Sequence, residues 1–438
     1  MSIIPAIESV LAEIGIDPNA LKFIKPRSKR AQYRAIVDWL TNYTPQPEAT
    51  ALEQIRGYLE TLHHLCKIQA WKGIKVILNV PIPINPPTVS LSIPLSEYLL
   101  FKELPRNLLE ISENCISSFK DADNDFYYYI LILKARALTS TNENPEETSN
   151  LFKEIIFKLP EDSELHIEAK ARLAIHQVKL GLYQEGIAKL QQSLININNL
   201  LLNYYNNLAF NFKELRADLL DSLALYEMNS SHFKKAMKLY TELITTRKKS
   251  GMSHKLVMPL VHEGILMRKM GDYNKAIKYL REAEKKSIEI NNKIYLILID
   301  HHLAFVLINQ GEDLITAEKL SQSALERYKK LDDPKGISDC YEQQGFIHLA
   351  KDEIDEAEKN FELALNLRKS INNRHGTASS VMDLALVSWH KKRYLKFISL
   401  FFQAFYLYYK LGVLNYIRFY RLLKLAYVWI LGKRDWSM

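Results

Sequence analysis

The sequence predicts an all-α fold, an α-solenoid built from antiparallel helix pairs. Small residues recur along the second half of the chain, and from Ala236 onward the steps are 40, 41, 40 and 40 residues. A period of about 20 to 50 residues is typical of stacked units that cannot bury their apolar faces alone. The composition agrees, because 14 glycines and 15 prolines in 438 residues favour helices over strands. The recurring positions are Gly186, Ala236, Ala276, Ala317, Ala357 and, where the next small residue is due, Phe397.

Each of the last four repeats opens with an apolar-periodic helix, breaks at a short polar turn and resumes as a second amphipathic helix. The breaks fall at Gly271-Asp272, at Gly311 to Asp313, at Lys351-Asp352 and at Lys391 to Arg393. Glycine accepts the left-handed backbone that follows a helix, and aspartate or asparagine caps the next helix. The breaks therefore predict helix–turn–helix units.

The small residues predict close contacts between the two helices of a pair. Gly264, Gly345 and Ala385 fall in first helices, where they leave room for a large side chain of the second helix. The large residues expected to fill the adjoining holes are Tyr273, Leu280, Phe361 and Tyr394.

This pattern resembles the tetratricopeptide repeat family over about residues 50 to 412, most clearly from residue 165 onward. The motif positions are matched by Gly271, Tyr273, Ala276, Leu280 and Ala283 in one repeat, and by Ile354, Ala357, Phe361 and Ala364 in another. The resemblance implies a right-handed superhelix. The spacing exceeds the usual one of about 34 residues and resembles the longer-helix variety of bacterial signalling and peptide-sensing proteins and of kinesin light chain.

Four regions are expected along the chain. Residues 1–45 would form a small helical head, and residues 50–160 degenerate helical repeats. The latter are interrupted at 81–94, where five prolines exclude a helix and indicate a linker or a surface loop. Residues 165–412 would form the regular array. Residues 413–438 would form a basic, aromatic capping helix.

No catalytic, cofactor or metal motif is found, so we expect a protein that is not an enzyme. P-loop, GxGxxG, GxSxG and HExxH patterns are absent. The pairs His63-His64 and His301-His302 are interpreted as ordinary helix-surface histidines. The cysteines form no CxxC, and Cys66 and Cys340 are expected in the core. Cysteine usage, the lack of a signal peptide and the lack of a long apolar run predict a cytoplasmic protein.

The resemblance implies that the first helix of each pair lines a concave face. One interpretation is a solvated face without a particular ligand. The other is a groove for a peptide, with Asn309 and Gln310 bonding its backbone and Asp339 and Glu342 meeting its basic side chains. The candidate residues are Asp221, Asn229, Arg268, Lys269, His302, Asn309, Gln310, Asp339, Glu342, Phe346 and Trp389.

The C-terminal 50 residues form a second candidate surface. They hold ten basic residues and one acid, which accounts for the net charge of +8, and 15 of the 46 aromatic residues. A terminal helix normally caps a solenoid. The basic outer side, with Arg418, Arg421 and Lys424, also suits a protein partner, self-association, a membrane surface or nucleic acid, through residues 389–438.

Together these features predict a non-enzymatic interaction scaffold or adaptor that binds a peptide or protein segment in the concave groove. Two alternatives stay open. One is a peptide-responsive signalling regulator, in which a ligand compresses the superhelix. The other is a membrane-surface or nucleic-acid adaptor that acts through the basic C-terminal helix.

Overall fold

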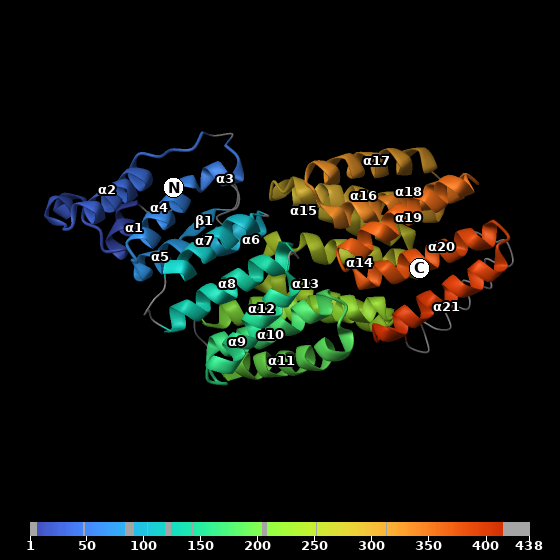
Figure 1. Ribbon diagram of the computed structural model, residues 1–438, viewed down its shortest axis with the longest axis horizontal. Coiled ribbons are helices and arrows are strands. Elements are labelled where there is room, and N and C mark those ends of the chain that lie inside the picture. The colour runs from blue at the N-terminus through green and yellow to red at the C-terminus, as the bar shows by residue number, and fades with distance from the viewer. Residues whose placement is uncertain are drawn as a thin grey trace. The chain divides into compact units, whose positions relative to one another are not determined.

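The computed structural model describes residues 7–46, 49–83, 92–102, 104–118, 124–141, 144–203, 208–250, 252–311 and 313–414. The chain divides into two compact units, residues 1–173 and 174–438. The boundary falls inside a helix, close to residue 165, where the regular array was expected to begin. Helices dominate both units (Figure 1).

The first unit is built from short and medium helices and one small hairpin. The helix α4 contacts α2, α5 and α7, and α8 contacts α7 and α9. Side chains of α8, α9 and α10 form a shared apolar core that includes Leu131, Phe152 and Leu173. The elements are α1 Ile7–Glu13, the 3₁₀ helix η1 Pro18–Phe23, α2 Arg27–Thr41, α3 Ala51–Gln54, α4 Arg56–Lys67, α5 Trp71–Leu78, β1 Pro81–Pro83, β2 Ser92–Pro94, α6 Leu95–Phe101, α7 Pro105–Ser118, α8 Asn124–Thr141, α9 Pro145–Lys158 and α10 Glu164–Lys179.

The proline-rich break contains an antiparallel hairpin that the sequence analysis missed. Its strands β1 and β2 pair Ile82 with Ile93, and both side chains are buried. A proline lacks the N–H that a ladder needs, but a two-stranded ribbon has a free edge on each strand where that N–H is not required. The prediction that this segment is not helical is confirmed at its described ends.

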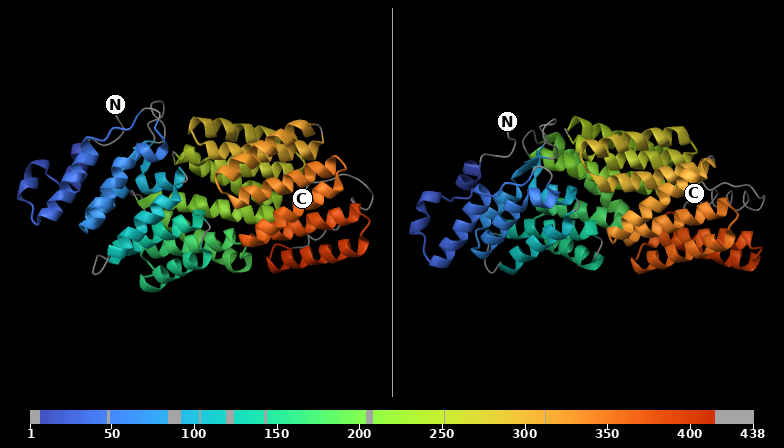
Figure 2. Two further views of the ribbon diagram at one scale, coloured as in Figure 1. Left: turned by 45° about the horizontal axis from the view of Figure 1, so that its top comes forward. Right: turned by 90° about the horizontal axis from the view of Figure 1, so that it is seen from above.

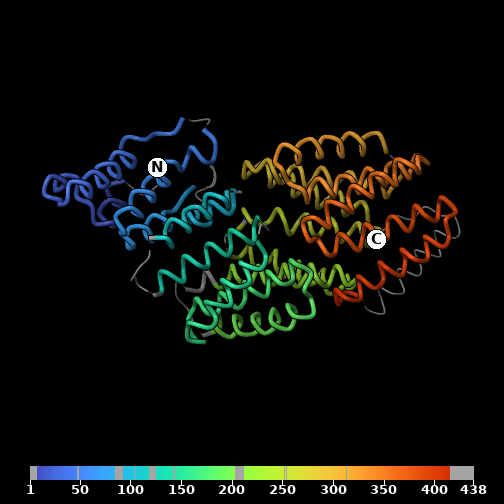
Figure 3. The backbone as a smooth tube through the Cα atoms, viewed as in Figure 1, coloured from blue at the N-terminus to red at the C-terminus, as the bar shows by residue number. Residues whose placement is uncertain are grey.

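The second unit is a series of antiparallel helix pairs joined by short turns (Figure 3). The pairs α12/α13, α14/α15, α16/α17, α18/α19 and α20/α21 lie side by side in all views (Figure 2). The prediction of an all-α solenoid is confirmed. The elements are α11 Tyr183–Asn203, α12 Leu208–Asn229, α13 Phe233–Lys249, the 3₁₀ helix η2 Ser253–Lys255, α14 Val257–Met270, α15 Tyr273–Glu289, α16 Lys293–Gln310, α17 Leu314–Lys330, α18 Pro334–Ala350, α19 Ile354–Ser370, α20 Arg374–His390 and α21 Tyr394–Lys410.

The recurring small residues occupy one structural position, the fourth residue of each second helix. Ala236, Ala276, Ala317 and Ala357 are fully buried there. The small residues of first helices also accept large partners as predicted. A methyl group on Gly264 would lie 2.8 Å from Leu280, and one on Gly345 would lie 2.5 Å from the Phe361 ring. Real Cβ atoms do not approach so closely, so each glycine is required by the packing.

One of the expected hole-filling residues does not fill a hole. Half of Tyr394 is exposed at the start of α21, although its ring contacts Trp389 with 5.0 Å between centroids. An aromatic residue at the first position of a helix lies at its end, where the neighbouring helix covers only one side of the ring.

Each predicted turn contains one residue with a left-handed backbone. Gly271 and Gly311 have φ values of 81° and 72°, and Asp352 and Lys392 adopt 63° and 56° at the equivalent place. The Asp272 carboxylate then accepts a hydrogen bond from the Lys275 N–H, 3.2 Å away, and so caps α15. The sequence pattern therefore located both the turns and a capping residue.

The first helices lie on the inner side of the second unit. The helix α12 contacts α14, α14 contacts α16, and α16 contacts α18, so successive first helices touch directly. In agreement with these contacts, every residue of α20 from Ser380 to Ser388 is buried. Because the first helices are the more crowded layer, they form the inner face of this unit.

The two ends of the second unit contact each other. A methyl group on Gly181, in the turn after α10, would lie 3.2 Å from Leu411 Cδ2. One on Gly412, just past α21, would lie 2.8 Å from Gln184 Cγ. The first and the last helix pairs of this unit are therefore neighbours.

Candidate binding face of the second unit

All the described candidate residues lie on first helices, as the register predicted. The structure thus gathers the candidates on one layer of the second unit. Asp221 and Asn229 are on α12, Arg268 and Lys269 on α14, His302, Asn309 and Gln310 on α16, Asp339, Glu342 and Phe346 on α18, and Trp389 on α20.

Arg268 and Asn309 form a polar pair between α14 and α16. The Arg268 Nη1 donates to Asn309 Oδ1 at 3.0 Å, and the guanidinium lies 5.0 Å from the centre of the Phe305 ring. Burial lowers the pKa of Arg268 to about 10, so the group stays charged at neutral pH. Next to this pair, Phe346 is buried against Phe305 and Phe361. The oxygen of Asn309 therefore holds an arginine of this chain.

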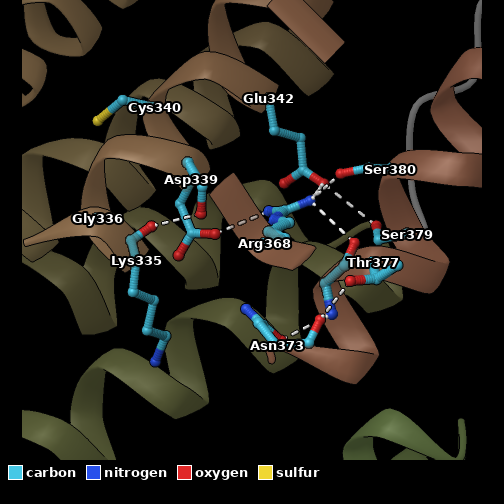
Figure 4. Close-up of polar contacts among 12 residues, drawn as sticks. Lys335, Gly336, Asp339, Cys340, Glu342, Arg368, Asn373, Thr377, Ser379 and Ser380 are labelled. Carbon is cyan, nitrogen blue, oxygen red and sulfur yellow. Dashed lines mark hydrogen bonds and ion pairs between the residues drawn. The ribbon is translucent and has the colours of Figure 1, made fainter. Parts of the chain in front are cut away.

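Three helices contribute to a buried charge cluster centred on Arg368 of α19 (Figure 4). The Arg368 Nη2 donates to Asp339 Oδ1 at 2.7 Å, and Nη1 donates to Glu342 Oε1 at 2.7 Å and to Ser380 Oγ at 2.8 Å. The Ser379 hydroxyl of α20 also donates to Glu342, at 3.2 Å. The acids that were expected to meet basic side chains of a ligand thus meet an arginine of their own chain.

A third carboxyl group, that of fully buried Asp383 of α20, completes this α18–α20 cluster. Burial raises the pKa of Asp383 well above its usual value, and the neighbouring Glu342 carboxylate raises it further. Burial would also raise the pKa of Glu342, but the charge and hydrogen bonds of Arg368 lower it to about 2. No donor of the described residues reaches Asp383. The protonated form of Asp383 is therefore favoured, and its carboxyl O–H can donate a hydrogen bond to the Glu342 carboxylate.

A matching cluster joins α12, α13 and α14. Arg247 Nη2 donates to Asp218 Oδ1 at 3.1 Å, and His262 Nδ1 lies 3.0 Å from Asp221 Oδ1. Burial alone would raise the pKa of Asp221, but the His262 and Arg247 charges lower it. Each of the four residues stands 121 positions before its counterpart in the α18–α20 cluster, so both clusters use the same repeat positions. The counterparts are Asp218 and Asp339, Asp221 and Glu342, Arg247 and Arg368, and His262 and Asp383.

Sequence reasoning missed the two arginines because they lie on second helices, outside the layer that it searched. Arg247 and Arg368 are each eleven residues past the small residue of their helix. Buried Tyr328 and Tyr408 hold the corresponding positions in α17 and α21. A charged residue at a position that is otherwise uncharged, with Ser287 in α15, was the signal that could have found them.

The interpretation of the paired histidines as surface residues is wrong for His301. Its side chain is buried, its ring lies edge-on to Phe305 at 5.1 Å, and its Nδ1 is 3.8 Å from Cys340 Sγ. His302 is half-buried, and burial lowers the pKa of both imidazoles, that of His302 well below its usual value. Both rings are therefore neutral at pH 7. Cys66 and Cys340 are buried as predicted.

The remaining candidates sit at the ends of first helices. The Asn229 amide donates to the Tyr183 hydroxyl at 3.3 Å. Lys269 and Gln310 are half-exposed near the C-terminal ends of α14 and α16. Trp389 packs with its ring 5.3 Å from that of Phe397. These side chains lie at the rim of the face, whereas Arg268 and Glu342 lie deeper.

The described part of the basic, aromatic end is partly neutralised. Glu358 of α19 pairs with Lys391, with Arg393 at 3.3 Å and with Lys396 at 3.1 Å. Aromatic and aliphatic side chains of α21 are exposed beside them, among them Leu395 and Phe402. The predicted capping helix 413–438, with Arg418, Arg421 and Lys424, lies outside the described residues beyond position 414 and stays a prediction.

Two properties, membrane-spanning helices and groups of metal ligands, concern only the ranges that the structure describes. Within them, no helix combines the length and the apolar character that a membrane span requires. Within the same ranges, no three side chains among His, Cys, Asp and Glu are grouped as ligands for a metal ion.

No protein-family model and no curated protein sequence matches the chain. Among solved structures, it is similar to the Rap conjugation gene regulator of the plasmid pLS20 in complex with the Phr* peptide. That match covers 82% of this chain and 98% of the regulator, at 13% identity and a TM-score of 0.51. A signal transduction ATPase with numerous domains and a tetratricopeptide repeat sensor, from Pyrococcus horikoshii, matches 89% of this chain at 16% identity and a TM-score of 0.51. The chain covers 54% of that ATPase.

Identities this low establish the fold alone. The second unit belongs to the α-solenoids made of antiparallel helix pairs. Its repeats are of the tetratricopeptide type, with the small residues and turns at the positions of that motif.

Proposed function

We propose that this protein is a non-enzymatic interaction protein that binds a peptide or protein segment on the inner face of its second unit. The observation that carries the proposal is the gathering of half-exposed polar side chains on the rim of the first helices, above buried polar pairs that fix those helices. A segment with an exposed backbone finds donors and acceptors along such a face. That the Rap regulator was solved in complex with a peptide supports the same use of this fold.

The buried pairs have a positioning role in this proposal. Arg268 with Asn309, and Arg368 with Asp339 and Glu342, tie neighbouring helices together by charge-assisted hydrogen bonds. Contact with the bound segment falls to side chains nearer the rim, such as Lys269 and Gln310. A face held rigid in this way loses less entropy when it binds.

The test compares the inner and the outer face by affinity capture from an extract of the source cells, followed by quantitative mass spectrometry. The inner variant carries Lys269→Ala and Gln310→Ala. The matched control carries Lys285→Ala and Lys319→Ala, two exposed positions on the second helices α15 and α17. We expect the inner variant to lose captured partners by about tenfold, a change of about 1.4 kcal/mol, and the control to retain them. Equal capture by all three proteins would overturn the proposal.

A second candidate is a ligand-responsive regulator whose second unit opens and closes. The contact of Gly412 with Gln184 favours it, because a unit whose ends only touch can separate at that point. Gln184→Trp would force the ends apart, whereas Gln184→Ala would leave room for the contact. Small-angle scattering should show a larger radius of gyration for the tryptophan variant. The amount of partner protein captured from the extract should change in the same variant. A larger radius with unchanged capture would reject a regulatory role for this contact.

A further inference from the structure

In the first unit, two cysteines that are far apart in the sequence lie in contact. Cys66 is on α4 and Cys115 is on α7, and their Sγ atoms are 3.3 Å apart. Both thiols are free. A disulfide has an S–S bond of about 2.05 Å, so the two sulfur atoms need to approach by only about 1.3 Å to form one.

The two thiols differ in their access to solvent. A cavity of about 390 Å³ borders Cys66, and its other lining residues include Glu53, His63 and Glu110, whose side chains are exposed. Cys115 is completely buried and is not part of the lining. A small polar molecule that enters the cavity therefore meets Cys66 first and Cys115 only through it.

The local hydrogen bonding favours the same order. Either thiol can donate in this contact, and a hydrogen bond from Cys115 lowers the pKa of the Cys66 thiol, while burial opposes this effect. The pKa of Cys115 is raised by its bond to Cys66 and by burial. The thiolate is the nucleophilic form of a cysteine, so Cys66 is the attacking thiol of the pair. The other titratable side chains of the cavity wall are one arginine, one histidine and three glutamates, namely Arg56, His63, Glu53, Glu60 and Glu110.

We propose that Cys66 and Cys115 form a peroxide-responsive dithiol that closes into a disulfide between α4 and α7. The Cys66 thiolate attacks one oxygen of hydrogen peroxide, the O–O bond breaks, and hydroxide leaves and is protonated to water. Cys66 then carries a sulfenic acid. The Cys115 sulfur attacks the Cys66 sulfur, the S–O bond breaks, and the departing hydroxide takes the Cys115 proton as a second water. Two thiols lose two electrons, and one peroxide becomes two waters.

The disulfide would link two cysteines that are 49 residues apart in the chain and enclose α5, the hairpin and α6. A cross-link of this span restricts the unfolded chain and stabilises the folded one. Oxidation therefore restricts the movement of α4 relative to α7, which both line the cavity. Reduction by a dithiol removes this restriction. This inference does not depend on the function proposed for the second unit.

The test treats the reduced full-length protein with hydrogen peroxide, blocks the remaining thiols and maps the peptides by mass spectrometry. Cys340 is the internal control, because it is buried in the second unit beside His301 and has no other cysteine near it. We expect a cross-linked peptide that joins Cys66 to Cys115, formed about tenfold faster than any oxidation of Cys340. Oxidation of Cys340 at the same rate, or no cross-linked peptide, would overturn the proposal.

Two variants separate the roles of the thiols, and circular dichroism confirms that each is folded. In Cys115→Ser, Cys66 should stop at the sulfenic acid and be trapped by a cyclic diketone. In Cys66→Ser, Cys115 should stay reduced because peroxide does not reach it. Oxidation of Cys115 in Cys66→Ser at the wild-type rate would contradict the assignment. The wild-type cross-link remains decisive if either variant fails to fold.

Discussion

In the α12–α14 cluster two carboxylates face one guanidinium and one imidazole, whereas in the α18–α20 cluster three carboxyl groups face one guanidinium. The backbone positions are the same, and the decisive difference is the residue that the next first helix contributes, His262 or Asp383. A buried charge without a partner is costly. The first cluster sets an imidazole beside its carboxylates, whereas the second sets there a carboxyl group whose buried site favours the protonated form.

The comparison shows that a repeat can keep a buried polar position while changing how its charge is balanced. In both clusters the arginine reaches forward to the next repeat. Arg247 also donates to the Lys255 carbonyl, at 2.6 Å, and Arg368 to the Gly376 carbonyl, at 3.3 Å. The arginine therefore joins successive helix pairs, and the residue at 262 or 383 decides which titratable group lies beside that junction.

The largest effect is expected from Arg368→Ala, which leaves Asp339 and Glu342 buried without their cation. Breaking a buried ion pair by removing one partner costs about 3–5 kcal/mol. Hydrogen exchange should show a large loss of protection in α18, α19 and α20. Arg327→Ala is the matched control, because Arg327 pairs with Asp300 at 3.1 Å but is one-third exposed. Its cost should stay below about 1 kcal/mol. Equal losses in the two variants would contradict the central role of Arg368.

An effect of opposite sign, which depends on pH, is expected from Asp383→Asn. Folded Asp383 keeps a proton that the unfolded chain releases above its usual pKa of about 4, so wild-type stability falls as the pH rises from there toward the raised folded pKa. The asparagine amide donates to Glu342 without binding a proton. In that window the variant should gain about 1.4 kcal/mol over the wild type per pH unit.

Thermal unfolding at several pH values measures this gain. The contribution of the Glu342 carboxylate to stability depends on pH with the opposite sign, in a lower pH range. Its stabilisation is present above its unfolded pKa and is lost as the pH falls through about 2. A difference between the asparagine variant and the wild type that stays constant as the pH rises above about 4 would show that Asp383 does not retain its proton.

The smallest effect is expected from His262→Gln. The change removes the imidazole next to Asp221 but leaves a group that can donate a hydrogen bond, so the cost should be about 1 kcal/mol at neutral pH. The pKa of Asp221 is lowered, so this part of the stability is lost as the pH falls through it. The cost of the substitution should therefore shrink in acid, as thermal unfolding below pH 4 would show. A cost that persists there would indicate lost packing instead of a lost charge pair.

The sequence allowed most of the second unit to be predicted. The small residues marked the places where helices approach, and Gly271 and Gly311 marked turns that require a left-handed backbone. The periodicity of the sequence predicts such features because each of them depends on one residue and its local backbone. The hairpin at 81–94 was missed because its pairing joins residues across a loop, and because its five prolines outweighed the alternation of Val89, Leu91 and Ile93 with serines.

The layer of helices that carries the candidate residues was predicted, but the pairing of their side chains was not. The register placed Asp339 and Glu342 on the inner face, yet the cation that they meet comes from α19. Likewise, Cys66 and Cys115 share no motif and meet only because α4 packs on α7. Contacts between side chains that are far apart in the sequence depend on how helices stack, and the spacing within one segment does not contain that information.

The most direct test of the proposed binding face places a photo-cross-linking amino acid at Gln310, on the rim of α16, and separately at Lys319, on α17. Both positions lie on adjacent helices of one pair and differ in the layer they occupy. After illumination in the source cells, we expect defined protein adducts from position 310 and only background from position 319. Adducts from position 319 with none from position 310 would contradict the account.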